Sequence, residues 1–337
     1  MRVRSGGRRR ATGLARLSLM LVVIVLLAGC GGGSGSDDKS VTIGLTYVPN
    51  IQFAPFYVAD SLGYYKDAGL KVSFHHHGAG EDEFGALVGG KEDVIFAGGD
   101  EMLQAQSRGV PIVYLAQVFT QYPVALIVPA DSPIKTAADL RGHSVGVPGA
   151  YGATYIGLLA LLQQGGLTQK DINMQSIGFT QIPALMSHKV DAVMGYLNNE
   201  AIQFNKAGFA TRTIPVSDAQ PLISNGIGAL QKEIDANPDT MKAVIAATLK
   251  GVDYVAAHPD KAVDISAKYV PDLKDDKNKA DALAVLNATI PLMQQPSGKA
   301  GATDANAWSS MEKFLQDNGQ LEKPVDASAA FSNKYLP

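Results

Sequence analysis

The strongest constraint on the fold is an alternation of short apolar segments with longer helical patterns over residues 41–216. Strands that alternate with helices predict parallel α/β sheets with helices on both faces. One series begins with a predicted strand at Val41–Leu45 and includes helices predicted over Phe53–Tyr65 and Glu81–Val88. A second series begins at Ser144–Val147. Beyond residue 230 the pattern is helical, and we expect breaks at the prolines, namely Pro238, Pro259, Pro271 and Pro291.

The two series resemble each other in one segment. Residues 91–98 (KEDVIFAG) and 189–196 (KVDAVMGY) each place a lysine and an aspartate just before an apolar strand. Chance explains this match as readily as common structure does, but together with the alternation it indicates two similar α/β lobes. Ligands of open α/β sheets bind beyond the carboxyl ends of the strands. Two lobes that face each other by those ends would enclose a cleft.

The N-terminus has the pattern of an export signal. Residues 1–29 contain six arginines and no acidic residue, and an apolar run covers Leu17–Leu27. This run is shorter than the roughly 20 residues that a membrane-spanning helix needs. It ends in Leu-Ala-Gly-Cys30, which resembles a bacterial lipobox, and Cys30 is the only cysteine. We therefore predict a signal peptide over 1–29 and lipidation of Cys30. An ordinary signal peptide and an uncleaved anchor are the alternatives, and Arg8-Arg9-Arg10 leaves the twin-arginine export route open.

The composition of the remaining chain excludes several classes of function. Without the signal, the chain has 23 basic and 32 acidic residues, a net charge of −9. Nucleic-acid binding is not expected from such a chain, because it requires clustered Lys and Arg. A single cysteine allows no internal disulfide. Residues 30–40, rich in Gly, Ser and Asp, predict a flexible tether.

Several motifs resemble the solute-binding proteins of ABC importers, in the branch that binds thiamine-precursor pyrimidines, riboflavin, and alkanesulfonates such as taurine. The resemblance covers most of residues 41–226. The motifs are YVPNIQFAPFYVA (47–59), GYYKDAGL (63–70), GGDE (98–101), GVPGAYG (146–152) and GYLNNE (195–200).

This resemblance implies an α/β, two-lobed periplasmic-binding-protein-like fold, with doubly wound lobes joined by two crossover strands and able to close by hinge bending. We expect the first part of lobe 1 at 41–126, lobe 2 at 127–218, and a return to lobe 1 with C-terminal helices at 219–337. The implied partners are a small-molecule ligand, an ABC permease with its ATPase, and membrane lipid through Cys30. We expect a monomer, without cofactor or bound metal, on the outer face of the cell membrane.

The predicted ligand-binding residues follow the ends of predicted strands. In lobe 1 they are Tyr47, Asn50 and Glu101, and in lobe 2 they are Tyr151, Tyr155, Tyr196, Asn199 and Glu200. Tyrosine rings can stack on a flat ligand, and carboxylates and amides can accept or donate hydrogen bonds. Several of these residues also have a structural interpretation: Asn50 as a helix N-cap, Glu101 and Glu200 as acids in a first helical turn, Tyr47 as a core or rim residue, and the turn with Tyr151 and Tyr155 as a plain turn and helix start.

The resemblance favours a planar nitrogen heterocycle, because in pyrimidine-binding relatives an aromatic residue and a glutamate at the positions of Tyr196 and Glu200 hold an aminopyrimidine. Leu197, Asn198 and Asn199 depart from that pattern, and are closer to riboflavin-type relatives. An alkanesulfonate is the alternative ligand, held at the turn 149–155.

An extracytoplasmic enzyme is the third hypothesis. It has little support, since the related pyrimidine-precursor synthases carry a cysteine-rich motif. His75-His76-His77 is interpreted as a polar strand end rather than a metal site, because the sequence shows no partner cluster.

Overall fold

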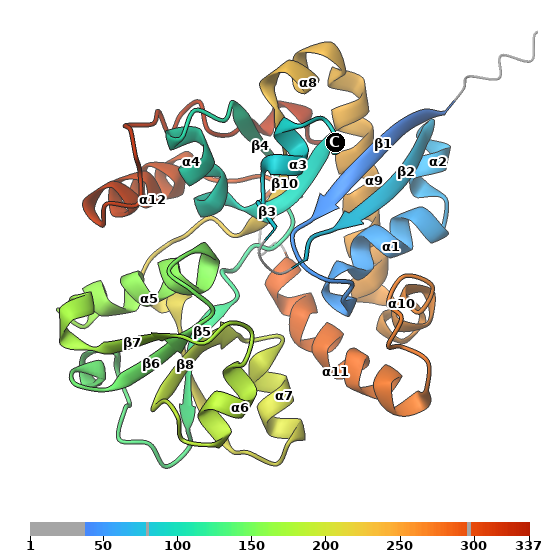
Figure 1. Ribbon diagram of the computed structural model, residues 1–337. Coiled ribbons are helices and arrows are strands. Elements are labelled where there is room, and N and C mark those ends of the chain that lie inside the picture. Colours follow the sequence, from blue (N-terminus) through green and yellow to red (C-terminus); the bar gives the residue numbers. More distant parts are fainter. Residues whose placement is uncertain (1–37, 79–80, 295–297) are drawn as a thin grey trace, which may run out of the picture. The chain divides into compact units, whose positions relative to one another are not determined.

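Five strands form the first sheet, sheet A, in a computed structural model that describes residues 38–78, 81–294 and 298–337 (Figure 1). The strand order is β2-β1-β3-β10-β4. Strand β1 runs parallel to β2 and β3, whereas β10 runs antiparallel to β3 and β4. The strands are β1 (Lys39–Leu45), β2 (Leu70–His76), β3 (Val94–Gly98), β4 (Ile112–Gln117) and β10 (Asn225–Leu230).

The second sheet, sheet B, repeats this plan in the order β7-β6-β8-β5-β9. Strand β6 is parallel to β7 and β8, and β5 is antiparallel to β8 and β9. Its strands are β5 (Val124–Pro129), β6 (Ser144–Val147), β7 (Asn173–Ser176), β8 (Ala192–Tyr196) and β9 (Thr211–Pro215). We call the elements around sheet A lobe 1 and those around sheet B lobe 2. The predicted two-lobed α/β fold is confirmed.

The repeated aspartate has the same local role in both sheets. Asp93 Oδ2 accepts a hydrogen bond from the Thr42 backbone N–H at 2.8 Å, and Asp191 Oδ2 accepts one from Ser144 N–H at 2.8 Å. Each carboxylate therefore satisfies a donor on the adjacent parallel strand, β1 or β6, just before β3 or β8 begins. This shared contact explains why both series place an aspartate just before the apolar segment.

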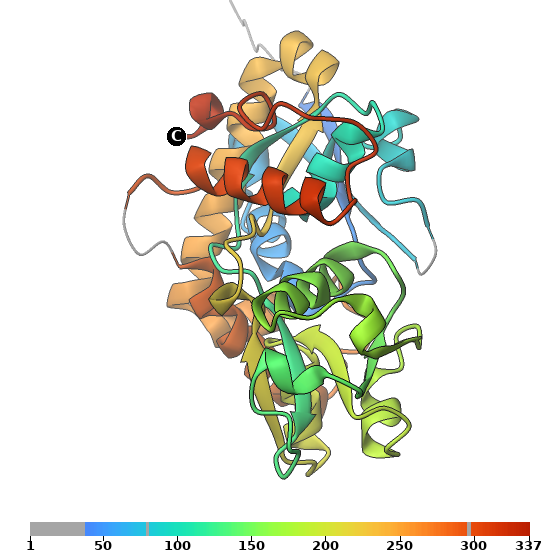
Figure 2. The ribbon, with the colours of Figure 1, turned by 90° about the vertical axis from the view of Figure 1, so that its left-hand side faces the viewer.

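Helices cover the sheets. Around sheet A they are α1 (Ala54–Ser61), α2 (Tyr64–Asp67), α3 (Gly85–Val88), α4 (Gly99–Ser107), α8 (Gln231–Ala236), α9 (Pro238–Ala257), α10 (Pro259–Ser266), α11 (Asp276–Met293) and α12 (Ala305–Asp317). Around sheet B they are α5 (Gly152–Gln164), α6 (Gln181–Met186) and α7 (Glu200–Lys206). Short 3₁₀ turns are η1 (Ile51–Phe53), η2 (Ala137–Leu140), η3 (Gln169–Asp171), η4 (Val216–Asp218) and η5 (Asn333–Tyr335). Both views group α8 and α12 with sheet A (Figure 1, Figure 2).

Three predicted helix boundaries differ from the structure. The single helix expected over Phe53–Tyr65 is two helices, because Gly63 adopts a left-handed conformation with φ 79° between α1 and α2. The helix expected over Glu81–Val88 is only the short α3. Pro291 lies inside α11 rather than ending it, whereas Pro238 and Pro259 stand at helix starts.

The two chain crossings connect the lobes through the antiparallel strands. Strand β5 enters sheet B directly after β4 of sheet A, and β10 returns to sheet A after β9. The expected boundary between 126 and 127 falls inside β5. Cys30, the signal peptide and most of the tether lie outside the described residues. Within the described residues, no helix has the length and apolar character needed to cross a membrane.

Candidate functional site

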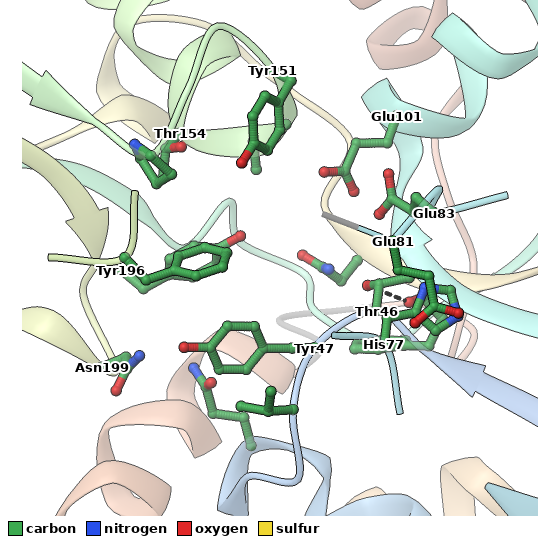
Figure 3. Close-up of a pocket in the computed structure, with 18 of the residues that line it drawn as sticks. Thr46, Tyr47, His77, Glu81, Glu83, Glu101, Tyr151, Thr154, Tyr196 and Asn199 are labelled. Atoms are coloured by element: carbon green, nitrogen blue, oxygen red, sulfur yellow. Dashed lines mark hydrogen bonds between the residues drawn. The ribbon is translucent and has the colours of Figure 1, made fainter. Parts of the chain in front are cut away.

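A cavity of about 700 Å³ is lined by residues of both lobes (Figure 3). Strands β1, β2, β6 and β8 direct their carboxyl ends toward it, so the residues that follow these strands form much of its surface. A volume of this size is typical of sites for small organic molecules. The position agrees with the cleft expected from the two facing lobes.

Six of the eight predicted ligand-binding residues line this cavity: Tyr47, Glu101, Tyr151, Tyr196, Asn199 and Glu200. Asn50 and Tyr155 are not among the lining residues. Asn50 Oδ1 accepts a hydrogen bond from Gln52 N–H at 3.1 Å and so acts as the N-cap of η1. Tyr155 lies on α5, and its side chain is buried in the core. A ligand contact for any of the six stays a prediction.

Aromatic side chains from both lobes point into the cavity. Figure 3 shows Tyr47 from lobe 1 together with Tyr151 and Tyr196 from lobe 2 around the same space. Tyr151 is exposed, and Phe179 packs edge-on against Tyr47 with ring centroids 5.8 Å apart. Such rings offer flat apolar faces with a hydroxyl at the edge, which suits a planar ligand that carries polar substituents.

Glu200 holds the turn that carries Tyr196 and Asn199. Its Oε2 accepts a hydrogen bond from Tyr196 N–H at 2.8 Å, and its Oε1 lies 3.3 Å from Asn199 Nδ2. Gln203 Nε2 donates to Asn199 Oδ1 at 2.6 Å, which fixes the amide orientation. Burial raises the pKa of Glu200. The carboxyl therefore positions its own turn, in addition to lining the cavity.

The opposite side of the cavity is an acidic wall formed by Glu81, Glu83 and Glu101. Glu101 Oε2 accepts a hydrogen bond from Gly98 N–H at 2.8 Å at the start of α4. Burial, together with the charge and hydrogen bond of Glu101, raises the pKa of Glu83 well above its usual value. Two neighbouring carboxyls that share a proton present both a donor and acceptors, which suits ligand hydroxyl or amino groups.

A lobe 1 carboxylate reaches the start of lobe 2 helix α5. A Cβ placed on Gly152 would lie 3.5 Å from Glu101 Oε1. The Ala153 backbone N–H is a hydrogen-bond partner of the Glu101 carboxyl and lowers its pKa, but burial has a larger effect and raises it. Helix N-termini attract anions. The protein's own carboxylate thus occupies the position where the turn 149–155 would otherwise hold an anionic ligand.

Tyr122, in the segment that crosses from lobe 1 to lobe 2, links helices α4 and α5. The Tyr122 hydroxyl lies 2.6 Å from Asp100 Oδ2 on α4 and 3.1 Å from the Ala153 carbonyl oxygen on α5. Asp100 is fully buried, and its Oδ1 has no hydrogen-bond partner among the described residues. Burial, followed by the nearby charge of Glu101, raises the pKa of Asp100 to about 7.

Several lining residues were not predicted from the sequence, among them Thr46, Gln52, His77, Glu83, Thr154 and Phe179. Thr46 and His77 directly follow β1 and β2, so the strand-end rule alone identifies them. Glu83 and Phe179 lie in loops that no periodic pattern marks.

Two α/β lobes with a ligand-sized cavity between their strand ends form a two-lobed solute-binding protein fold. The chain belongs to the NMT1/THI5-like family, whose model matches residues 50–262.

Two relatives and one solved structure illustrate the family and the fold. The riboflavin-binding protein RibY of Chloroflexus aurantiacus is 33% identical over 304 residues, covering 89% of this chain and 86% of that protein. The formylaminopyrimidine-binding protein of Halalkalibacterium halodurans is 26% identical over 319 residues, covering 88% and 92%. The aliphatic sulphonate binding protein SsuA of Escherichia coli has a TM-score of 0.70 at 20% identity, covering 87% and 97%. Other relatives are named as pyrimidine phosphate synthases.

Proposed function

We propose that the protein is the ligand-capturing subunit of an ABC importer and that its ligand is riboflavin or a closely similar planar heterocycle. The observation that carries this proposal is the cavity of about 700 Å³, in which tyrosines of both lobes stand opposite an acidic wall. A fused flavin ring fits between aromatic faces, and the hydroxyls of a ribityl chain suit carboxyl partners. RibY, a relative of similar length, is named for the same ligand.

A thiamine-precursor pyrimidine is the second candidate. A relative named as a formylaminopyrimidine-binding protein supports it, and the Tyr196–Glu200 turn suits an aminopyrimidine edge. A single pyrimidine ring would fill a smaller part of the cavity. An alkanesulfonate is disfavoured, because the Glu101 carboxyl lies at the start of α5, where the helix N-terminus would otherwise hold the anion. A synthase activity has little support, because the chain has no cysteine besides Cys30.

A thermal-shift and titration-calorimetry panel tests this choice. The purified protein is measured with riboflavin, formylaminopyrimidine, hydroxymethylpyrimidine, thiamine and taurine. A bound ligand raises the unfolding temperature according to its concentration relative to Kd. We expect riboflavin to give the largest shift and taurine none. A shift with taurine but not with riboflavin would exclude the proposed ligand class.

The Glu200→Gln variant is expected to bind the ligand about 10-fold more weakly than the parent. The glutamine amide oxygen can still accept the hydrogen bond from Tyr196 N–H. Its NH₂ group then faces Asn199 Nδ2, also a donor, so the turn loses the hydrogen bond between residues 199 and 200. Hydrogen bonds to charged groups contribute about 1.5–3 kcal/mol. Calorimetric Kd values measure the change. Glu322→Gln, an exposed substitution outside the cavity, is the control. If Glu200→Gln binds the ligand as tightly as the parent, Glu200 does not contribute to ligand binding.

We further propose that Cys30 is lipidated and holds the protein on the outer face of the membrane, next to a permease. The basic head, the short apolar run and the Leu-Ala-Gly-Cys sequence support this. Acyl chains contribute about 0.8 kcal/mol per buried methylene, so two or more give stable anchoring. The exported protein should partition into the detergent phase, and Cys30→Ser should shift it to the aqueous phase. Equal partitioning of both would argue against the anchor.

A further inference from the structure

Two histidines and a glutamate meet on one face of sheet A, at its β2 side. His75 and His77 are alternate residues at the end of β2, so their side chains lie on the same face. Glu92 precedes β3, two positions away in the sheet order. Strand β1 lies between them, and there Gly44 pairs with His75 on one side and Ile95 on the other.

Gly44 is what allows these side chains to meet across β1. A Cβ at this position would lie 2.3 Å from Glu92 Oε2, so any other residue would displace the carboxylate. With glycine there, His75 Nδ1 and His77 Nε2 each lie 2.6 Å from Glu92 Oε1. One potential ligand atom from each of the three residues lies within 4.8 Å of the others. The sheet register therefore brings together a group that the sequence separates.

The burial of this cluster leaves polar atoms unsatisfied. The Glu92 side chain has an exposed fraction of 0%, and that of His77 is 4%. Glu92 Oε2 and His77 Nδ1 are buried without a hydrogen-bond partner among the described residues. A buried carboxylate is costly unless its charge is paired and its oxygens are bonded. A cation bound by His75 Nδ1, His77 Nε2 and Glu92 Oε1 would balance the buried carboxylate charge at the atoms that the imidazoles now contact by hydrogen bonds.

We propose that His75, His77 and Glu92 bind one divalent transition-metal ion, with Zn²⁺ the best match. Two imidazole nitrogens and one carboxylate oxygen form a ligand set that zinc uses with three protein ligands, and water completes the tetrahedron. Imidazole nitrogen favours zinc, copper, nickel and iron over magnesium and calcium, which prefer oxygen ligands alone. Only His77 of the three lines the ligand cavity, so the ion would fix the end of β2 beside that cavity.

Titration of tag-free, chelator-treated protein tests the site. Calorimetry with Zn²⁺ should give one ion per chain and a higher unfolding temperature, and Co²⁺ should give the intense visible absorption of a tetrahedral site. His75→Ala is the first variant, because this side chain is the most exposed of the three and its loss is least disruptive to folding. It should weaken Zn²⁺ binding at least 10-fold, as should Glu92→Gln.

His143→Ala is the matched control, since His143 lies 3.4 Å from Asp191 in lobe 2 and no described residue offers a third ligand there. It should bind Zn²⁺ like the parent. The proposal is overturned if the parent shows no saturable binding of one ion, if His75→Ala retains parental affinity, or if His143→Ala loses as much affinity as His75→Ala. Riboflavin affinity is measured separately, so failure of this site leaves the proposed transport function unaffected.

Discussion

The double variant Tyr47→Ala, Tyr196→Ala is expected to bind riboflavin about 100-fold more weakly than the parent. The two rings enter the cavity from opposite lobes, so a flat ligand between them loses a stacking partner on each side. Stacking of a heteroaromatic ring on an aromatic side chain contributes about 1–3 kcal/mol, and about 1.4 kcal/mol corresponds to a tenfold change in Kd. Titration calorimetry, or quenching of flavin fluorescence, measures the change.

The matching control replaces both residues by phenylalanine. Phenylalanine retains the ring faces and removes only the hydroxyls, so we expect affinity within a few-fold of the parent. Circular dichroism should show that both double variants remain folded. An alanine variant that binds as tightly as the parent would mean that the ligand does not lie between these rings.

Stability should fall as the pH rises from about 4 to 8, and Asp100 should contribute to the fall. Burial raises the pKa of this carboxyl from 3.8 to about 7 in the folded protein. Below pH 3.8 the carboxyl is protonated in both states. Between the two values the unfolded chain ionises while the folded protein keeps the proton, so unfolding becomes easier. Above pH 7 the loss is complete, at most about 4 kcal/mol.

Urea unfolding at pH 5 and pH 8 measures this effect. The Asp100→Asn variant should lose clearly less stability over this interval than the parent. Glu83, Glu101 and Glu200 also have raised pKa values and remain in the variant, so part of the slope should persist. Glu322→Gln, which changes one exposed carboxyl, should keep the parental slope. The same slope in Asp100→Asn and the parent would contradict the assignment.

The fold could be predicted because its signals are local. Apolar strands separated by helical segments indicate an α/β sheet wherever they occur, and the repeated aspartate before β3 and β8 marks equivalent strands. The errors arise where tertiary packing overrides a local rule. Pro291 is tolerated in the last turn of α11, where its missing N–H removes one helical hydrogen bond and where Thr120 N–H and Gln121 N–H hold the helix end by donating to Leu292 O.

The site was predictable only in part. Tyr47 and Tyr196 could be identified at the ends of β1 and β8, because the rule that ligands bind beyond the carboxyl ends of strands depends on strand position alone. The contact between His77 and Glu92 depends on sheet register and on the missing side chain at Gly44, which no spacing along the chain reveals. Asn50 shows why the rule is not specific: a polar residue after a strand is equally suited to capping a helix, and here it caps η1 and does not line the cavity.

The insertion of β10 between β3 and β4 sets an order of assembly. All five strands of sheet B fall within residues 124–215, so lobe 2 has every strand it needs before β10 is available. A chain is synthesised from its N-terminus, and until residue 230 has followed, β3 and β4 lack the strand that joins them. Unpaired strand edges invite association with other chains. The newly made protein should therefore be most vulnerable to aggregation and proteolysis in lobe 1, which is begun first and completed last.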